Sequence, residues 1–248
     1  MSAAIAGTTL VVVPTYDEIE SLPGVLDRLL GALPDARVLV VDDASPDGTG
    51  EWADARAAAD PRIAVLHRPA RSGLGSAYVD GFRWGLARGA TALAQMDADG
   101  SHRPEQLGRL LARTAGPDRP DLVIGSRWVR GGSVRGWPMP RRLLSRAGNL
   151  YIRAMLGMGV RDATAGFRVY RADWLARSGV LDRVGARGYG FQVEMTWEAV
   201  RSGAVVVEVP IAFEERRFGA SKLSGGIFAE ELSLVTRWGV RRIAQGLR

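Results

Sequence analysis

Two aspartates separated by one residue, Asp97 and Asp99, directly follow the short apolar run at residues 92–96. Such a run predicts a buried strand that delivers the next residues to the edge of a sheet. Because side chains alternate along a strand, we expect both carboxylates on one side and Ala98 on the other. Two close carboxylates repel each other unless a cation joins them, and oxygen ligands suit Mg²⁺ or Mn²⁺. The tripeptide alone is more typical of a solvated turn, so its interpretation depends on the rest of the chain.

Polar residues also end two other apolar runs. Residues 8–13 lead into Pro14-Thr15-Tyr16-Asp17-Glu18, and residues 38–41 lead into Asp42-Asp43. Further strands are predicted at 63–66, 92–96 and 122–124, and helical patterns occupy 22–33, 49–59, 76–87 and 104–114. This alternation predicts an α/β fold, with a mostly parallel central sheet and helices on both faces. Ligands of such sheets bind at the carboxyl ends of the strands, so the acidic residues there predict a nucleotide site with a metal ion.

The net charge of +6 is concentrated in one part of the chain. Residues 122–161 contain no Asp or Glu but include eight arginines, namely Arg127, Arg130, Arg135, Arg141, Arg142, Arg146, Arg153 and Arg161. The remainder of the chain carries no excess of basic residues. Such a basic window predicts an anionic partner, which would be a phosphate, a nucleic acid or a lipid headgroup.

The composition excludes several other classes of site. The chain has no cysteine and only two histidines, so thiolate chemistry and His-rich zinc sites are not expected. The loop at Gly73-Leu74-Gly75 lacks the third glycine of a dinucleotide-binding motif, and no Walker-type phosphate loop occurs. No apolar stretch approaches the roughly 18 residues of a membrane span, and no secretory signal is visible. We therefore expect a soluble or peripheral cytoplasmic protein.

Seven segments together resemble the family 2 glycosyltransferases of the GT-A fold, and among these the polyprenol-phosphate (dolichol-phosphate) mannose synthases. In chain order the segments are 13–18, 41–49, 96–102, 125–127, 161–168, 190–194 and 216–224. Each is weak by itself, but their order extends the resemblance over nearly the whole chain. It implies a Rossmann-like GT-A glycosyltransferase domain over residues 1–224 and a C-terminal amphipathic helix over 225–248.

The resemblance implies roles for the residues near the strand ends. The nucleotide sugar would contact Pro14, Tyr16, Glu18, Asp43, Asp97, Ala98 and Asp99. Asp97 and Asp99 would hold Mg²⁺ or Mn²⁺ against its diphosphate. Ser101 would be a third metal ligand, although relatives often have Gln at that position.

The resemblance also assigns the basic residues. The acceptor phosphate would bind Arg127, Arg141 and Ser145, and the last two, four residues apart, share one helical face. Arg216, Ser221 and Lys222 would form a loop over the donor phosphates. Lys222 is the only lysine of the chain, and its compact ammonium suits contact with phosphate. The residues expected to act in catalysis are Asp99, Arg127, Arg141, Ser145 and Lys222.

The implied reaction transfers mannose from GDP-mannose to a polyprenyl (dolichyl) monophosphate, giving polyprenyl-phosphate mannose and GDP, with a metal ion and with inversion at the anomeric carbon. A glucosyltransferase that uses UDP-glucose and the same lipid is the alternative, because the base-contacting residues do not distinguish the two donors. A non-catalytic nucleotide-binding or nucleic-acid-binding module is a remote alternative. Nucleic acid is not expected, because no recognition motif accompanies the basic window.

Apolar residues alternate with basic ones at 137–140 and 150–158, a pattern typical of contact with a membrane surface. A final amphipathic helix is predicted at about 227–247, where it would pack on the domain or lie on the membrane. The expected partners are therefore GDP-mannose, the acceptor lipid and the membrane surface. A separate membrane-anchoring protein is a further candidate partner.

Overall fold

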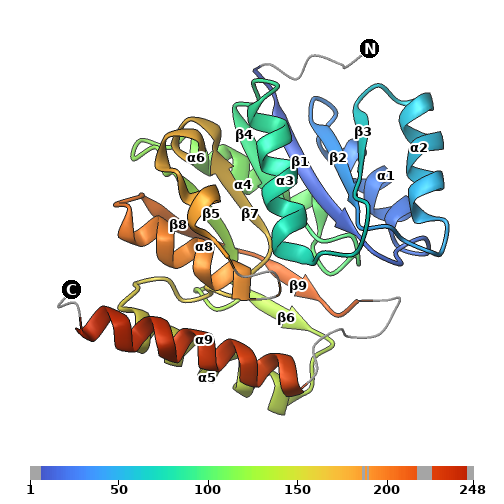
Figure 1. The fold of residues 1–248 in the computed structure, drawn as a ribbon. Helices are drawn as coiled ribbons and strands as arrows, with labels where there is room; N and C mark the ends of the chain where they lie inside the picture. Colours follow the sequence, from blue (N-terminus) through green and yellow to red (C-terminus); the bar gives the residue numbers. More distant parts are fainter. Residues whose placement is uncertain (1–6, 186–187, 189, 217–224, 245–248) are drawn as a thin grey trace.

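The computed structural model describes residues 7–185, 188, 190–216 and 225–244, which form an α/β fold around one central sheet (Figure 1). The seven strands of this sheet lie in the order β3-β2-β1-β4-β7-β5-β8. Their bounds are β1 Thr9–Thr15, β2 Arg37–Asp42, β3 Ile63–His67, β4 Ala92–Gln95, β5 Leu122–Ser126, β7 Arg168–Arg171 and β8 Val206–Pro210. All neighbours are parallel except β7, which is antiparallel to β4 and β5. The predicted mostly parallel sheet is confirmed.

Helices cover both faces of the sheet because the strand side chains are apolar in both directions. In β1, Leu10, Val11, Val12 and Val13 are all fully buried, as expected for a strand of a parallel sheet. Burial of each such side chain stabilises the fold by roughly 1.5–3 kcal/mol.

Two apolar cores lie on the two faces of the sheet. Leu10 and Val12 belong to the core that includes residues of α3 and α8, whereas Val11 and Val13 belong to the core that includes residues of α1 and α4. The helix bounds are α1 Leu22–Ala32, α2 Thr49–Ala59, α3 Leu74–Leu86, α4 Leu107–Thr114, α6 Ala172–Ser178, α7 Val180–Arg183 and α8 Gly190–Arg201, with a 3₁₀ helix at Pro104–Gln106 before α4.

The segment after β4 differs from the prediction. β4 ends at Gln95, and the chain then turns at residues 98–99 before Gly100, whose φ is +74°. The expected alternation of strand side chains therefore does not position Asp97 and Asp99. Their positions depend on the hydrogen bonds of a turn.

The reversed strand β7 is a second feature that the sequence did not predict. Because it runs against its neighbours, the residues before β7 reach the same edge of the sheet as the residues after β4 and β5. A separate two-stranded parallel sheet, β6 Ser133–Arg135 with β9 Ala212–Glu214, lies beside this edge (Figure 1).

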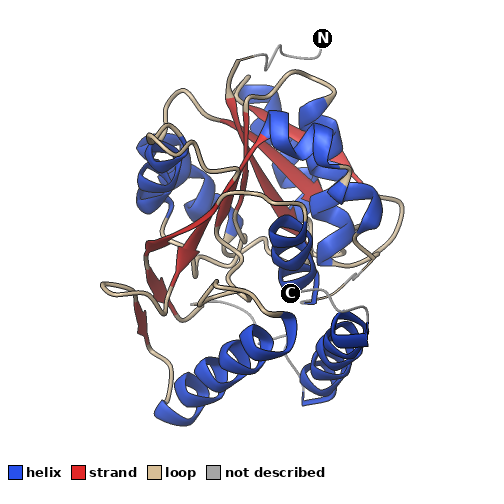
Figure 2. Ribbon diagram, turned by 90° about the vertical axis from the view of Figure 1, so that its left-hand side faces the viewer, coloured by secondary structure: helices blue, strands red, loops and turns tan. Residues whose placement is uncertain are grey.

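Two long helices, α5 Met139–Leu156 and α9 Gly225–Ala244, form a layer of their own at one end of the molecule (Figures 1 and 2). They approach closely at Gly239, where a Cβ would lie 2.6 Å from Cε of Met155. The ring of Trp238 stacks on Trp197 of α8 with a centroid distance of 5.7 Å, which joins α9 to the domain. Within the described residues, no helix combines the length and the hydropathy that crossing a membrane requires.

Candidate active site

The loops after β1 and β2 are held together by side chains. Oγ1 of Thr15 donates a 2.9 Å hydrogen bond to Oδ1 of Asp42, and the backbone N–H of Glu18 donates one of 3.1 Å to Oγ1 of Thr49. Thr15 and Asp42 are the paired last residues of adjacent strands. The segments 14–18 and 42–49, which contain the predicted nucleotide contacts Pro14, Tyr16, Glu18 and Asp43, therefore form one surface.

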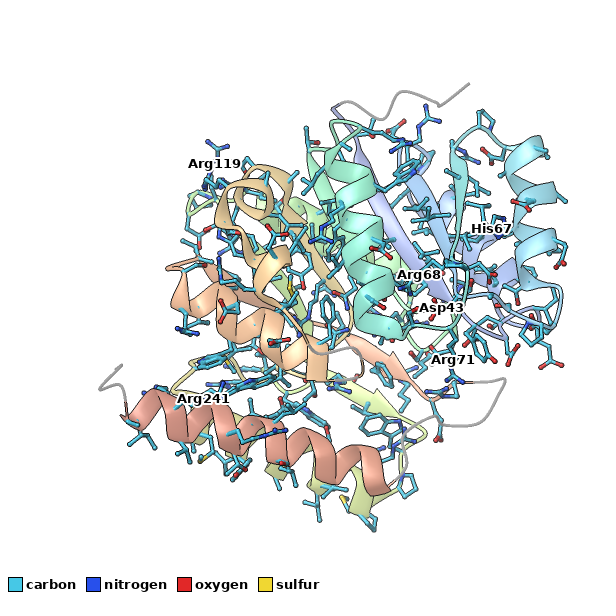
Figure 3. All side chains as sticks on the ribbon, in the orientation of Figure 1. Asp43, His67, Arg68, Arg71, Arg119 and Arg241 are labelled. Atoms are coloured by element: carbon cyan, nitrogen blue, oxygen red, sulfur yellow. The ribbon has the colours of Figure 1, made fainter. Side chains whose placement is uncertain are left out.

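Asp43 is fixed by three hydrogen bonds. Its Oδ1 accepts a 2.6 Å bond from Nη1 of Arg68, and its Oδ2 accepts bonds of 3.0 Å from the backbone N–H groups of Ser72 and Gly73. Figure 3 shows Asp43 and Arg68 side by side at the N-terminal end of α3, with Arg71 near them. These contacts hold the carboxylate in place beside the surface predicted for the nucleotide.

Tyr16 lies in the same region, as the sequence predicts. The guanidinium of Arg71 stacks on its ring, with Cζ 4.1 Å from the ring centroid. A cation placed over an aromatic face stabilises the ring orientation. Arg71 and Tyr16 therefore add a flat, positively charged wall near Asp43.

Asp97 is held by the core behind it. Its Oδ1 accepts a 2.9 Å hydrogen bond from the hydroxyl of Tyr78, and its backbone N–H donates one of 3.2 Å to Nδ1 of His102. Its side chain is 32% exposed. Desolvation by the surrounding protein is the main cause that raises the pKa of Asp97. A cation placed at the open side would favour the ionised form of this carboxyl group.

Asp99 is oriented by its own turn. Its Oδ1 accepts a 3.0 Å hydrogen bond from the backbone N–H of Ser101, and its Oδ2 lies 3.3 Å from Nη2 of Arg216. Ser101 is buried, as is Ala98. Asp97, Asp99 and Ser101 thus lie together on the turn that follows β4.

The donor atoms of this segment fit a hard divalent cation, because carboxylate oxygens are the ligands that Mg²⁺ and Mn²⁺ prefer. In the part of the chain that the structure describes, no group of three or more His, Cys, Asp or Glu side chains is arranged as a metal site. The two carboxylates would therefore supply only part of the coordination shell. Ions of this kind commonly complete their shell with water and substrate phosphate.

His102 connects this segment to the basic region. Its ring stacks on Phe167 with centroids 5.0 Å apart and packs edge-on against Phe213 at 5.6 Å. Burial is the main cause that lowers the pKa of His102. Because Nδ1 accepts the N–H of Asp97, the ring is neutral with its proton on Nε2. The histidine is thus a buried support of Asp97.

The aromatic contacts continue to the two arginines predicted to bind the acceptor. Phe213 packs edge-on against Trp137 at 5.4 Å. Cζ of Arg127 lies 5.4 Å from the Phe213 centroid and 5.6 Å from that of Trp137, and Cζ of Arg141 lies 4.1 Å from Trp137. The structure therefore brings Arg127 and Arg141 together around one indole ring, in a chain of contacts that leads back through His102 to Asp97.

Arg127 is more constrained than the sequence suggests. It is buried, and its Nε and Nη2 donate hydrogen bonds of 2.8 and 2.7 Å to the carboxylate of the fully buried Asp162. Nη2 also donates to Oγ1 of Thr164. Asp162 precedes β7, so the reversed strand delivers it to this edge. Only Nη1 of Arg127 has no hydrogen-bond partner among the described residues.

Arg141 and Ser145 lie on α5, in the same helical register as predicted. Nη1 of Arg141 donates a 2.9 Å hydrogen bond to Oε1 of Glu215, and both side chains are partly exposed. The carbonyl of Ser145 accepts a 3.0 Å bond from Nδ2 of Asn149. An exposed ion pair of this kind is weak and opens easily, so Arg141 remains accessible to an anion.

Some site residues were missed by sequence reasoning, and others cannot be placed. Tyr78 looks like an ordinary core aromatic of α3, and only its hydroxyl contact reveals its role. Asp162 falls within a recognised motif, yet its pairing with Arg127 depends on the unpredicted reversal of β7. The predicted loop residues Ser221 and Lys222 lie outside the described residues.

Comparison with known proteins identifies the family of this chain. The model of the family "Glycosyl transferase family 2" matches residues 10–179. An undecaprenyl-phosphate mannosyltransferase of Micrococcus luteus is 58% identical over 96% of this chain and 97% of that protein. A polyprenol monophosphomannose synthase of Mycolicibacterium smegmatis is 52% identical over 94% of this chain and 87% of that protein.

Solved structures of lower identity share the fold. A mannosyltransferase from Pyrobaculum calidifontis, in complex with GDP-Man and Mn²⁺, has a TM-score of 0.61 at 18% identity, covering 96% of this chain and 64% of that one. Glucosyl-3-phosphoglycerate synthase from Mycobacterium tuberculosis, in complex with Mn²⁺ and UDP-glucose, has a TM-score of 0.63 at 21% identity. The match covers 97% of this chain and 81% of that one. From the family model and the two sequence relatives together, it follows that this chain belongs to glycosyl transferase family 2.

Proposed function

We propose that this protein transfers a mannosyl residue from GDP-mannose to the phosphate of a polyprenyl monophosphate, giving polyprenyl-phosphate mannose and GDP. The observation that carries the proposal is the identity of 58% and 52%, over nearly the whole chain, to two proteins named for this class of activity. The continuous path of side chains from Asp97 to Arg141 supports it, because donor and acceptor must meet in one site.

The donor would lie along the surface formed after β1, β2 and β4. Pro14, Tyr16, Glu18 and Asp43 are the predicted contacts to its base and ribose. Asp97, Ala98 and Asp99 would border its diphosphate. Arg216, whose Nη2 lies 3.3 Å from Asp99, would place a positive charge beside the leaving GDP. Lys222 is proposed to add a second one.

Mg²⁺ or Mn²⁺ would be held by Asp97 and Asp99, with Ser101 as the proposed third ligand. When bound, such an ion stabilises the negative charge that develops on the leaving diphosphate. Tyr78 and His102 would keep the Asp97 carboxylate in position before the ion arrives. Because both act from the core, the site needs little reorganisation on binding.

The acceptor phosphate would bind near Trp137, with Nη1 of Arg127, Arg141 and Ser145 as its contacts. A phosphate monoester has its second pKa near 6, so its oxygen is largely ionised at neutral pH. This oxygen attacks the anomeric carbon while the bond to GDP breaks, and the proposal includes inversion at that carbon. Alignment rather than proton removal is then the main task, which agrees with a site whose histidine is buried and neutral.

The acceptor is a lipid, so the reaction is proposed to occur at a membrane surface. The α5–α9 layer is the part of the described structure that carries exposed apolar side chains together with arginines. A separate anchoring protein remains a candidate partner. Peripheral association at the inner face of the membrane is part of the proposal.

The test is a transfer assay with the purified full chain, undecaprenyl phosphate in detergent and labelled GDP-mannose or UDP-glucose. We expect organic-extractable mannolipid from GDP-mannose, no glucolipid, and no product after removal of divalent metal with EDTA. Asp99→Asn should lower the rate by roughly 100-fold or more, whereas Asp173→Asn, a surface change, should not. Product from UDP-glucose alone would establish the glucosyltransferase alternative. Full activity of Asp99→Asn would refute the metal assignment.

A further inference from the structure

An open pocket of about 250 Å³ lies along α5, and none of its lining residues is among those assigned to the donor. It is lined by Trp128, Arg146, Asn149, Leu150, Arg153 and Arg161. Three of these six residues are arginines and none is acidic. We call this cavity the arginine pocket, and the proposed reaction gives it no role.

No carboxylate of the described residues pairs with the charges of the arginine pocket. Among the described residues, Arg146, Arg153 and Arg161 form no ion pair with a carboxylate. Two acids lie beside Arg161, and neither forms an ion pair with the three arginines. Asp162 pairs with Arg127, and Glu208 accepts the backbone N–H groups of Arg161 and Asp162 at 2.8 and 3.0 Å. Three uncompensated guanidinium groups around one cavity favour an anion.

Buried polar atoms of the pocket also lack partners. Nε1 of Trp128 and Nε of Arg153 are buried donors without a hydrogen bond. Asn149 is only 2% exposed; its Nδ2 donates to Ser145 and Thr164, which leaves its buried Oδ1 free. Buried polar groups in native proteins almost always find a partner. Because water barely reaches these three atoms, a ligand would meet them only after the lining side chains shift.

The rim of the pocket is apolar. Leu150 lines the pocket and is 64% exposed, and it continues a stripe on the outer face of α5 that includes Met139, Leu143 and Leu144, at 62%, 59% and 53%. Of the large apolar side chains that are exposed in the described ranges, all but Val205 lie on α5 or α9. A phosphate-binding pocket beside an exposed apolar stripe fits an amphiphile whose headgroup is anionic.

We propose that the arginine pocket binds the phosphate of an anionic membrane phospholipid, while the apolar stripe of α5 enters the adjoining acyl region. Phosphatidylglycerol has the required chemistry, because it combines a phosphate diester with headgroup hydroxyls. This site is distinct from that of the acceptor lipid, whose phosphate contacts are proposed around Trp137. Thr164 lies between the two, since its Oγ1 accepts hydrogen bonds from Arg127 and from Asn149. A bound phospholipid would therefore fix the orientation of the active site above the bilayer.

The experiment measures sedimentation of the full chain with vesicles in the absence of donor, so it does not depend on the proposed transfer reaction. Vesicles of phosphatidylcholine alone, with phosphatidylglycerol, and with undecaprenyl phosphate are compared. The pocket variant is Arg146→Gln with Arg161→Gln. Its matched control is Arg237→Gln with Arg241→Gln, which removes the same charge from exposed positions of α9 in the same layer.

The pocket variant should lower the partition coefficient onto phosphatidylglycerol vesicles by roughly tenfold or more, and the control by clearly less. Soluble dihexanoyl phosphatidylglycerol should bind the native chain with one-to-one, saturable stoichiometry in calorimetry and should not bind the pocket variant. Activity of this variant in detergent, measured with undecaprenyl phosphate, should be retained. Loss of that activity would place the pocket in the acceptor site and would overturn the proposal.

Three further outcomes would overturn the proposal. Equal losses in the two double variants would mean that the membrane attracts the layer by charge alone. Equal affinity for inorganic phosphate and for the short-chain lipid would make the pocket a site for free phosphate. Pocket-dependent binding only to vesicles that contain undecaprenyl phosphate would make it part of the acceptor site.

Discussion

The hydroxyl of Tyr78 lies 2.9 Å from Oδ1 of Asp97 and donates a hydrogen bond to it. Tyr78 is fully buried, and its ring stacks on Phe82 and Phe191 at centroid distances of 5.9 and 6.0 Å. Core packing therefore determines where this hydroxyl lies. Tyr78 is a positioning residue for a carboxylate that is proposed to bind metal, although it does not itself reach the substrate.

Replacement of Tyr78 by Phe should weaken metal binding more than it weakens the fold. The ring and its stacking are retained, but the orientation of Asp97 is no longer fixed, and loss of such an outer contact typically costs 10- to 100-fold in metal affinity. We expect the Kd for Mn²⁺, measured by electron paramagnetic resonance, to rise by roughly that factor, with a smaller change in kcat at saturating metal. Tyr170→Phe, at another buried tyrosine, is the matched control. Unchanged Mn²⁺ affinity in Tyr78→Phe would contradict the assignment.

His102 should make the fold sensitive to mild acid. Burial holds the pKa of His102 below the ordinary value of 6.5. As the pH falls from 6.5 toward that lowered pKa, the unfolded chain binds a proton that the folded chain does not, so the free energy of unfolding decreases. Urea unfolding at pH 7.5, 6.5 and 5.5 should show this decrease.

In His102→Phe the ring stack is kept and the titrating group is removed, so the decrease between pH 6.5 and 5.5 should become smaller. The variant should also be less stable at pH 7.5 by about 1–3 kcal/mol, because the N–H of Asp97 loses its acceptor. His67→Gln removes the other histidine, whose side chain is 51% exposed, and serves as control. The same pH dependence in the native chain and His102→Phe would refute this explanation.

Asp162→Asn keeps the volume of the side chain but should strongly lower the free energy of unfolding. It removes the charge that neutralises the buried guanidinium of Arg127, and an unpaired buried charge costs about 3–5 kcal/mol. Guanidinium chloride unfolding should show this loss. Glu105→Gln removes one partner of the exposed Arg28–Glu105 pair and should cost a small fraction of that amount. A comparable loss in both variants would mean that the Arg127–Asp162 pair has no special importance.

Gly166→Ala should affect metal binding through close contact. A Cβ at this position would lie 3.3 Å from Oδ2 of Asp97 and 3.3 Å from Cε1 of His102. The added methyl group would push the carboxylate by a few tenths of an ångström, so Mn²⁺ affinity and the transfer rate should both fall. Gly24→Ala on α1, where a Cβ meets nothing within 4 Å, should leave both unchanged and stabilise the helix by roughly 0.5–1 kcal/mol. Equal Mn²⁺ affinity in the two variants would contradict this prediction.

The first five strands could be predicted because their apolar runs end sharply in polar residues. β1 through β5 all appear within about two residues of the predicted bounds. β7, with the sequence Arg168-Val169-Tyr170-Arg171, has only two apolar residues and gives no clear periodic signal. β6 and β9 are three residues each, which is too short for periodicity to appear.

The candidate site was predictable in composition but not in geometry. The sequence indicates Asp97 and Asp99 correctly as neighbours, yet it attributes their placement to strand alternation, whereas a turn at Gly100 sets it. The resemblance also names Arg127 as an acceptor contact, and that role stays a prediction. Asp162 accepts hydrogen bonds from Nε and Nη2 of Arg127. This pairing depends on the direction of β7, which is set by long-range contacts in the sheet.

The reversed direction of β7 also determines where this chain can tolerate extra residues. The segment that leads into β7 carries Asp162 and Gly166, which touch Arg127 and Asp97, so an insertion there would disturb two parts of the catalytic edge at once. The chain leaves β7 at the opposite edge, where Arg171 is bound to Asp173 and to the carbonyl of Arg119 near the surface. Inserted residues, tags and fused domains should therefore be tolerated better on the side of the sheet opposite the site.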